Sequence, residues 1–457
     1  MSSQLNVSSI SDFGQVSYDK DSEIHLDIIL TAPEKTDSKR IPLHLILAID
    51  CSGSMDGGKL EAVKKTTEKL ISHLTENDSL GMVGFSDNVW DIFKALPMTK
   101  ENKEQAKKEV KKLRTMSATN LSGAMVMAME RAMISDDSKV SRIILLTDGL
   151  PSSGECDKQK LTELAYKMNQ KVSMSTFGYG YDFDAELMAS ISSAGRGSSF
   201  YIKEDEDCNK AFAMELGGLL SLYAQNIKLT VTPSKTMEFK ELLSEYKCEQ
   251  KQGYRLVTAP KIEIQIDDIF AGEKKHVVLK LAVPKATEAV CARNTRVCSV
   301  DVFYTDVETK ASGSVSFNGF IQYVKPDKAP KSPNEEVHNQ ILLLEAAKAQ
   351  KEAQEKAGQG DFAGAQRILS QGLQGVEGMH GTQGTTVKNM FSKLQANFTD
   401  AQTYQSKGTK LAASYRYSMS NNRSASADTL SFASSGQADM LAKFMADPDP
   451  EKKEDEK

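Results

Sequence analysis

The chain has 457 residues, of which 40% are hydrophobic and 26% are charged, and its formal net charge is −5. This length is enough for two to four domains with ordinary packed cores. The slightly acidic balance gives no general case for binding nucleic acid or an anionic membrane. No stretch reaches the roughly 18 apolar residues of a membrane span, and residues 1–5 lack the pattern of a secretory signal.

Six cysteines are spread along the chain and never form a Cys-x-x-Cys pair. They are too sparse for a disulfide scaffold, and their spacing does not fit a zinc finger. Cys291 and Cys298 are close enough to pair across a hairpin, but free buried thiols are the favoured interpretation. We therefore expect an intracellular, cytoplasmic protein.

Between residues 41 and about 222, short apolar segments alternate with amphipathic ones. The expected strands are 43–49, 79–85, 142–147 and 172–177, and the expected helices are 59–74, 100–113, 121–133 and 158–169. Apolar strands that alternate with helices predict an α/β domain with a mainly parallel, doubly wound sheet covered on both faces. Ligands of such sheets bind outside the carboxyl ends of the strands.

The flanking segments have a different pattern, with short strands separated by Gly, Pro and charged turns. Strand-like segments are 14–32, 227–231, 254–257, 262–266, 276–281, 297–304 and 313–323. This pattern predicts a β-sandwich, which the amino-terminal strands complete, so that the α/β domain is an insertion within it.

Beyond a proline-containing linker, residues 334–358 and 361–375 predict a helical hairpin. Residues 402–436, rich in Ser, Asn, Ala and Gly, and the charged end 447–457 are expected to be mobile, with a short helix at 438–445 between them. The predicted division is listed here in chain order: amino-terminal strands 1–40, α/β domain 41–222, β-sandwich 223–326, helical hairpin region 327–400 and mostly flexible tail 401–457.

A polar loop follows the apolar run 43–49 and reads Asp50-Cys51-Ser52-Gly53-Ser54. One acid and two hydroxyls at alternate positions, at the end of a buried strand, predict a site for a hard cation. Oxygen ligands suit Mg²⁺, Mn²⁺ or Ca²⁺. A short loop with few ligands leaves coordination positions open for water or a partner.

Two further positions complete this site. Thr119 precedes a predicted helix, where its hydroxyl can reach a cation, and Asp148 ends the strand 142–147. Gly149 follows and permits a tight turn. Both acids therefore fall at the carboxyl ends of strands, where the ligand of this kind of sheet is expected.

These residues together resemble the metal-ion-dependent adhesion site of von Willebrand factor A domains, and that family has the doubly wound fold predicted above. The resemblance covers residues 41–222. It implies that Ser52, Ser54 and Thr119 contact Mg²⁺ directly or through water. It also implies that Asp50 and Asp148 supply negative charge, often through water. A carboxylate of a partner takes the vacant position.

Two glycine-containing stretches, 177–184 and 195–201, do not follow the dinucleotide-binding spacing, and the chain has no Gly-Lys-Ser/Thr phosphate loop. We interpret both as structural turns. The basic run 100–114 lacks interleaved aromatic residues, so a solvated helix face is favoured over a nucleic-acid patch.

The leading hypothesis is a non-enzymatic binding module that captures an Asp or Glu of a protein partner through Mg²⁺, with no nucleic acid or membrane as partner. The alternative is a structural or self-assembling protein with a vestigial metal site; the oligomeric state is not predicted. A hydrolase with Asp50 as nucleophile is disfavoured, because such phosphatases need Asp-x-Asp and position 52 is serine. Some plant relatives carry a RING zinc finger and act as ubiquitin ligases, but no Cys/His cluster here supports that activity.

Overall fold

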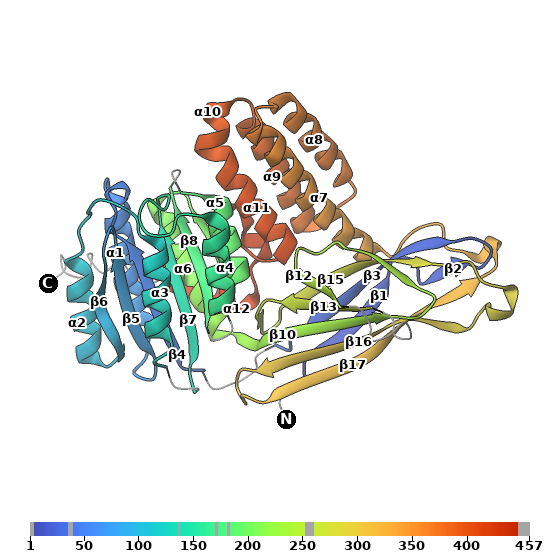
Figure 1. Cartoon of the computed structure of the whole chain (residues 1–457), viewed down its shortest axis with the longest axis horizontal. Helices are drawn as coiled ribbons and strands as arrows, with labels where there is room; N and C mark the ends of the chain where they lie inside the picture. Colours follow the sequence, from blue (N-terminus) through green and yellow to red (C-terminus); the bar gives the residue numbers. More distant parts are fainter. Residues whose placement is uncertain are drawn as a thin grey trace.

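The computed structural model describes residues 4–34, 40–135, 138–169, 172–180, 183–251 and 260–446. An α/β domain, a region of paired β-sheets and a group of helices lie side by side, with the helices in the angle between the other two parts (Figure 1). In the described residues, no helix is long and apolar enough to cross a membrane.

The sheet of the α/β domain has the strand order β6-β5-β4-β7-β8-β9, parallel except for the edge strand β6. Its strands are β4 (Leu43–Asp50), β5 (Ser79–Phe85), β6 (Val89–Pro97), β7 (Val140–Thr147), β8 (Ser173–Tyr179) and β9 (Arg196–Ile202). Its helices are α1 (Lys59–His73), α2 (Lys100–Lys111), α3 (Leu121–Ala132), α4 (Lys158–Met168), α5 (Ala185–Ala194) and α6 (Asp205–Leu220).

Both faces of this sheet are covered, as the apolar strands predicted. In β4, Ile46 and Ala48 share a core with α3, α4 and α5, whereas Leu45 and Leu47 share a core with α1, α2 and α6. Alternate side chains of a strand point to opposite faces, so a strand buried on both sides must be apolar throughout. The α/β fold is therefore confirmed.

The second glycine-containing stretch is not a turn, contrary to the sequence-based prediction, because residues 196–202 form the edge strand β9. The pairing of β9 with β8 is irregular between Met174 and Thr176. There Gly197 approaches the backbone so closely that a Cβ would collide with the Met174 carbonyl. Glycine permits this close approach. Because glycine has a low strand propensity, the sequence pattern of this segment does not indicate a strand.

The β region consists of two mainly antiparallel sheets that share one core. One sheet has the order β1-β3-β15-β11; the other has the order β12-β13-β10-β16-β17-β2, and β14 pairs with β10. Their bounds are β1 (Asn6–Ser11), β2 (Gln15–Ser17), β3 (Ser22–Thr31), β10 (Leu222–Pro233), β11 (Glu238–Leu242), β12 (Lys247–Lys251), β13 (Lys261–Ile266), β14 (Ile269–Phe270), β15 (Lys274–Val283), β16 (Asn294–Asp306) and β17 (Ser312–Val324).

The chain leaves the β region after β3, builds the α/β domain and returns at β10, so the α/β domain is inserted between these two strands. Strand β3 pairs along its whole length with β15, more than 240 residues later. The expected strand 254–257 lies outside the described residues.

The helical region extends well beyond the expected hairpin. It contains α7 (Glu335–Gly358), α8 (Phe362–Gly375), α9 (Gly381–Asn397), α10 (Ala401–Thr403), α11 (Thr409–Asn421) and α12 (Ser435–Ala446). Residues 402–436, which the composition predicted to be mobile, contain helix α11, where Tyr415 and Met419 are fully buried. Composition misleads here, since the many small residues allow close packing of backbones instead of solvating the chain. The end 447–457 lies outside the described residues.

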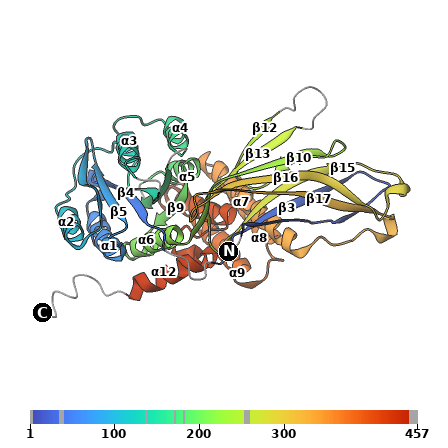
Figure 2. The ribbon, with the colours of Figure 1, turned by 90° about the horizontal axis from the view of Figure 1, so that it is seen from below.

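Helix α12 packs on α6 and so returns the end of the described chain to the α/β domain (Figure 2). Gln437 donates from Nε2 to the Met214 carbonyl at 3.2 Å, and Phe444 stacks on His73 of α1 with ring centroids 4.8 Å apart.

Charged side chains join the three parts in a buried junction. Arg142 of β7 donates to Asp268 in the β region, with Nη2 and Oδ2 2.8 Å apart. Arg423, which follows α11, donates to both oxygens of Glu273 at 2.7 and 2.8 Å. Lys275 of β15 lies 3.3 Å from the same carboxylate.

The crossing of α6 and α12 depends on Gly217, because a Cβ there would lie 2.7 Å from the Gly436 carbonyl and 2.8 Å from Cβ of Met440. We expect Gly217→Ala to lower the free energy of unfolding by about 1–3 kcal/mol through overpacking. Urea denaturation measures this. Gly375→Ala is the matched control, because no atom lies within 4 Å of its Cβ position; equal stability of the two variants would contradict the prediction.

Candidate metal centre

The site begins at the carboxyl end of β4, where Asp50 is fully buried. Its Oδ1 accepts a hydrogen bond from the Ser52 backbone N–H at 2.8 Å, and its Oδ2 accepts from Thr147 Oγ1 at 2.5 Å. The first bond folds the loop back on itself, and the second joins β4 to its neighbour β7. Both carboxylate oxygens are thus held before any ligand arrives.

The loop after β4 forms a short 3₁₀ turn, Gly53–Met55, and then leads into α1 through Gly57 and Gly58, which both have positive φ. These left-handed conformations favour glycine. Within the turn, the hydroxyl oxygens of Ser52 and Ser54 lie 3.0 Å apart.

A second loop brings in Thr119, whose side chain is 4% exposed. Two backbone bonds clamp this loop to the first: Met116 donates to the Cys51 carbonyl at 2.7 Å, and Gly53 donates to the Ser117 carbonyl at 3.1 Å. Asn120 then caps α3 by accepting from the Gly123 N–H at 2.9 Å. The position of Thr119 therefore follows from the start of a helix and from backbone pairing.

A third loop follows β7 and carries Asp148, which is fully buried. Its Oδ1 accepts from Ser54 Oγ at 2.7 Å, and its Oδ2 accepts from Lys59 Nζ at 2.6 Å. Lys59, the first residue of α1, had no role in the sequence-based site. A basic residue five positions after the predicted metal-binding loop 50–54 is the sequence signal that could have identified it. Thr147, the last residue of β7, also has no role in the sequence-based site.

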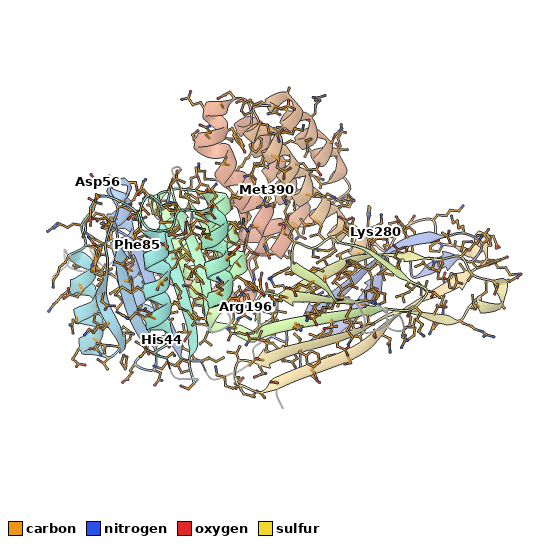
Figure 3. The ribbon with its side chains drawn as sticks, viewed as in Figure 1. His44, Asp56, Phe85, Arg196, Lys280 and Met390 are labelled. Atoms are coloured by element: carbon orange, nitrogen blue, oxygen red, sulfur yellow. The ribbon has the colours of Figure 1, made fainter. Side chains whose placement is uncertain are left out.

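The three hydroxyls surround one point beside Gly149. A Cβ at Gly149 would lie 3.2 Å from Ser54 Oγ, 3.3 Å from Thr119 Oγ1 and 4.0 Å from Ser52 Oγ. The structure therefore brings all five predicted site residues together at one end of the sheet. That end is opposite His44: Figure 3 shows Asp56, which lies in the loop after β4, at the far end of the domain.

The electrostatics of the site follow from its burial. Desolvation raises the pKa of Asp50 to about 6; the hydrogen bonds from Thr147 and Ser52 oppose this rise, and the charge of nearby Asp148 adds to it. Burial also raises the pKa of the Cys51 thiol to about 12, and its Sγ contacts the Ile49 carbonyl at 3.7 Å. Cys51 is therefore a protonated, packed thiol and takes no part in the site.

The donor set fits a hard divalent cation. It offers carboxylate and hydroxyl oxygens, the ligands that Mg²⁺ and Ca²⁺ prefer, around a space that a single methyl group would fill. The described residues contain no cluster of three or more His, Cys, Asp and Glu side chains that could hold a metal.

Comparison with known proteins supports the same assignment of the domain. The family model of the von Willebrand factor type A domain matches residues 44–213. Inter alpha-trypsin inhibitor, heavy chain 4, of Mus musculus is 26% identical over 263 residues, which cover 55% of this chain and 27% of that protein. The E3 ubiquitin-protein ligase WAV3 of Arabidopsis thaliana is 26% identical over 278 residues, which cover 60% of this chain and 35% of that protein. The chain spans less than half the length of either relative.

Two solved structures share the fold over nearly the whole chain. A von Willebrand factor type A protein from Catenulispora acidiphila superposes with a TM-score of 0.68 and 16% identity, covering 90% of this chain and 96% of that one. The ArnB paralog VWA2 from Sulfolobus acidocaldarius superposes with a TM-score of 0.61 and 16% identity, covering 92% of this chain and 98% of that one. The β region and the helical region thus recur beside the α/β domain in both structures.

The crowding around Gly149 leads to a prediction. In Gly149→Ala the added methyl group occupies the space between the hydroxyls, so we expect affinity for Mn²⁺ to fall at least about tenfold, which is about 1.4 kcal/mol. Calorimetric titration of the metal-free protein measures this. Gly378→Ala is the control, because its Cβ position is open; equal Mn²⁺ affinity in the two variants would show that the hydroxyls do not enclose a cation.

Proposed function

Because residues 44–213 form a von Willebrand factor type A domain, we propose that the chain is a protein-binding module whose Asp50 site holds a divalent cation and captures an acidic side chain of a partner. The preferred cation is Mg²⁺, and Mn²⁺ or Ca²⁺ also suit the donors. The observation that carries the proposal is the convergence of three hydroxyls and two buried carboxylates at the end of β4.

The charge of this donor set favours an anionic ligand. Ser52, Ser54 and Thr119 are neutral, so only Asp50 and Asp148 offset the charge of the metal. A metal held by few carboxylates keeps positive character and accepts a further oxygen ligand. The cation would polarise and orient that ligand; the chain's own residues fix the loops and hold the hydroxyls at the mouth of the site.

The rest of the chain serves as scaffold in this proposal. We divide it into a β-sandwich formed by residues 1–40 and 223–326, the helical region 327–400 and the following helices to residue 446. The buried junction of Arg142 and Arg423 sets how these parts sit against the α/β domain.

The first test is a pull-down from cell lysate with the purified chain in Mg²⁺, in chelator and as Asp50→Ala. We expect a protein that wild type retains in Mg²⁺ and that is lost in the other two conditions, because removal of Asp50 frees Thr147 Oγ1 and the Ser52 N–H and removes half of the carboxylate charge. Asp207→Ala, which removes an acid paired with Lys210 away from the site, should bind normally. Retention in all conditions would reject the proposal.

Partner capture should also alter α6. This helix ends at Leu220 and leads at once into β10 at Leu222, and α12 covers it. We expect slower hydrogen exchange in 205–220 and 435–446 when partner and Mg²⁺ are added together, measured by mass spectrometry. Slower exchange confined to the site loops would show that partner capture affects neither α6 nor α12.

A second candidate, self-assembly, has one observation in its favour. Val126 in the middle of α3 and Met133 and Ile134 just beyond its end are exposed apolar side chains, with 43%, 50% and 69% of their surface accessible. Exposed apolar side chains that form a continuous patch are often covered by another protein. Sedimentation that depends on concentration but not on chelator would favour this candidate over metal-dependent capture.

A further inference from the structure

A lysine lies inside the proposed metal centre. Nζ of Lys59 is 2.6 Å from Oδ2 of Asp148 and 3.1 Å from the Ser54 carbonyl oxygen. Asp148 is fully buried, whereas the Lys59 side chain is 22% exposed. The ammonium therefore lies at the edge of the site and contacts one of the two acids on which a cation depends.

The surrounding backbone fixes this position. Lys59 is the first residue of α1 and follows Gly58, which turns the chain with φ of 105°. The side chain runs along Gly180, where a Cβ would lie 3.3 Å from Lys59 Cε and 3.4 Å from Nζ. Positive φ at Gly180 and the absence of a side chain there leave a channel for the lysine.

The lysine changes the net charge of the site both without a metal ion and with one bound. Asp50 and Asp148 together carry two negative charges, and Lys59 reduces the total to one. A divalent cation then leaves the occupied site with one net positive charge, where it would otherwise be neutral. The same ammonium therefore repels an incoming metal ion and attracts the carboxylate that follows it. Both interactions act across a partly desolvated site, where charges are weakly screened.

We propose that Lys59 is a specificity-determining residue that weakens metal binding and strengthens capture of the acidic ligand, so that metal and ligand bind far better together than separately. This inference rests on the proposed function. It predicts opposite changes in two affinities, which loss of a merely structural contact would not produce.

The test uses the full chain and two calorimetric titrations: Mn²⁺ into metal-free protein, and glutarate, a simple dicarboxylate, into Mn²⁺-saturated protein. In Lys59→Gln we expect Mn²⁺ affinity to rise three- to tenfold and glutarate affinity to fall by a similar factor. Lys59→Arg keeps the positive charge, so its Mn²⁺ affinity and its glutarate affinity should both match those of wild type. Lys210→Gln removes a lysine paired with Asp207 elsewhere in the α/β domain and should change neither affinity.

The outcomes separate this inference from the proposed function. Wild type that does not bind Mn²⁺ would reject the metal centre itself. Wild type that binds Mn²⁺, with Lys59→Gln unchanged or with both affinities moving in the same direction, would reject the role of Lys59 alone. Circular dichroism of each variant establishes that it is folded, and Lys59→Met, which also removes the charge, replaces Lys59→Gln if the latter unfolds: the same opposite changes in Mn²⁺ and glutarate affinity must then appear.

Discussion

The arrangement of the three parts depends on the buried ion pairs between Arg142 and Asp268 and between Arg423 and Glu273. Each pair joins a different part to the β region, and all four side chains are at most 6% exposed. Charges removed from water are costly unless partners and hydrogen bonds compensate them fully. Arg423 meets this condition with two bonds to Glu273, one to the Asp268 carbonyl and a contact over the Phe270 ring. Such pairs specify orientation more than they add stability, because a small displacement of any part leaves an unpaired buried charge.

This junction and the candidate metal centre lie at opposite ends of the same strands. Arg142 is near the start of β7, and Asp148 follows the end of that strand. Helix α6 connects the two ends: Glu215 on it lies 3.7 Å from Nε of Arg142 and accepts from Ser175 at 2.6 Å. A displacement of α6 therefore strains the ion pairs directly, and the crossing with α12 resists it. Arg196, the first residue of β9, lies near this junction, between the α/β domain and the β region (Figure 3).

The parts of the fold that could be predicted from the sequence are those in which burial dictates composition. Strands such as β4 and β5 are apolar throughout because helices cover both faces, and the expected bounds agree with the structure to within a residue or two. Edge strands are less constrained: β6 is half exposed, and β9 depends on glycine, so neither carries a clear signal. The packing of α11 and α12 depends on long-range contacts with α7 and α6, which local composition does not encode. The motif identified the residues that meet at the candidate site, but Lys59 reaches it from the next helix, and only the three-dimensional path of the chain reveals that.

The insertion of the α/β domain between β3 and β10 has a structural consequence. The chain enters the sheet of the α/β domain at the start of β4 and leaves the domain after α6, at the end of the sheet that carries the junction, whereas Asp50, Thr119 and Asp148 lie at the opposite end. Substitutions in the proposed site loops therefore leave the ion pairs of the junction in place, and the α/β domain joins the β region through two chain connections only, one after β3 and one before β10. The residues proposed to recognise a partner and the residues that set the domain arrangement are thus separate sets.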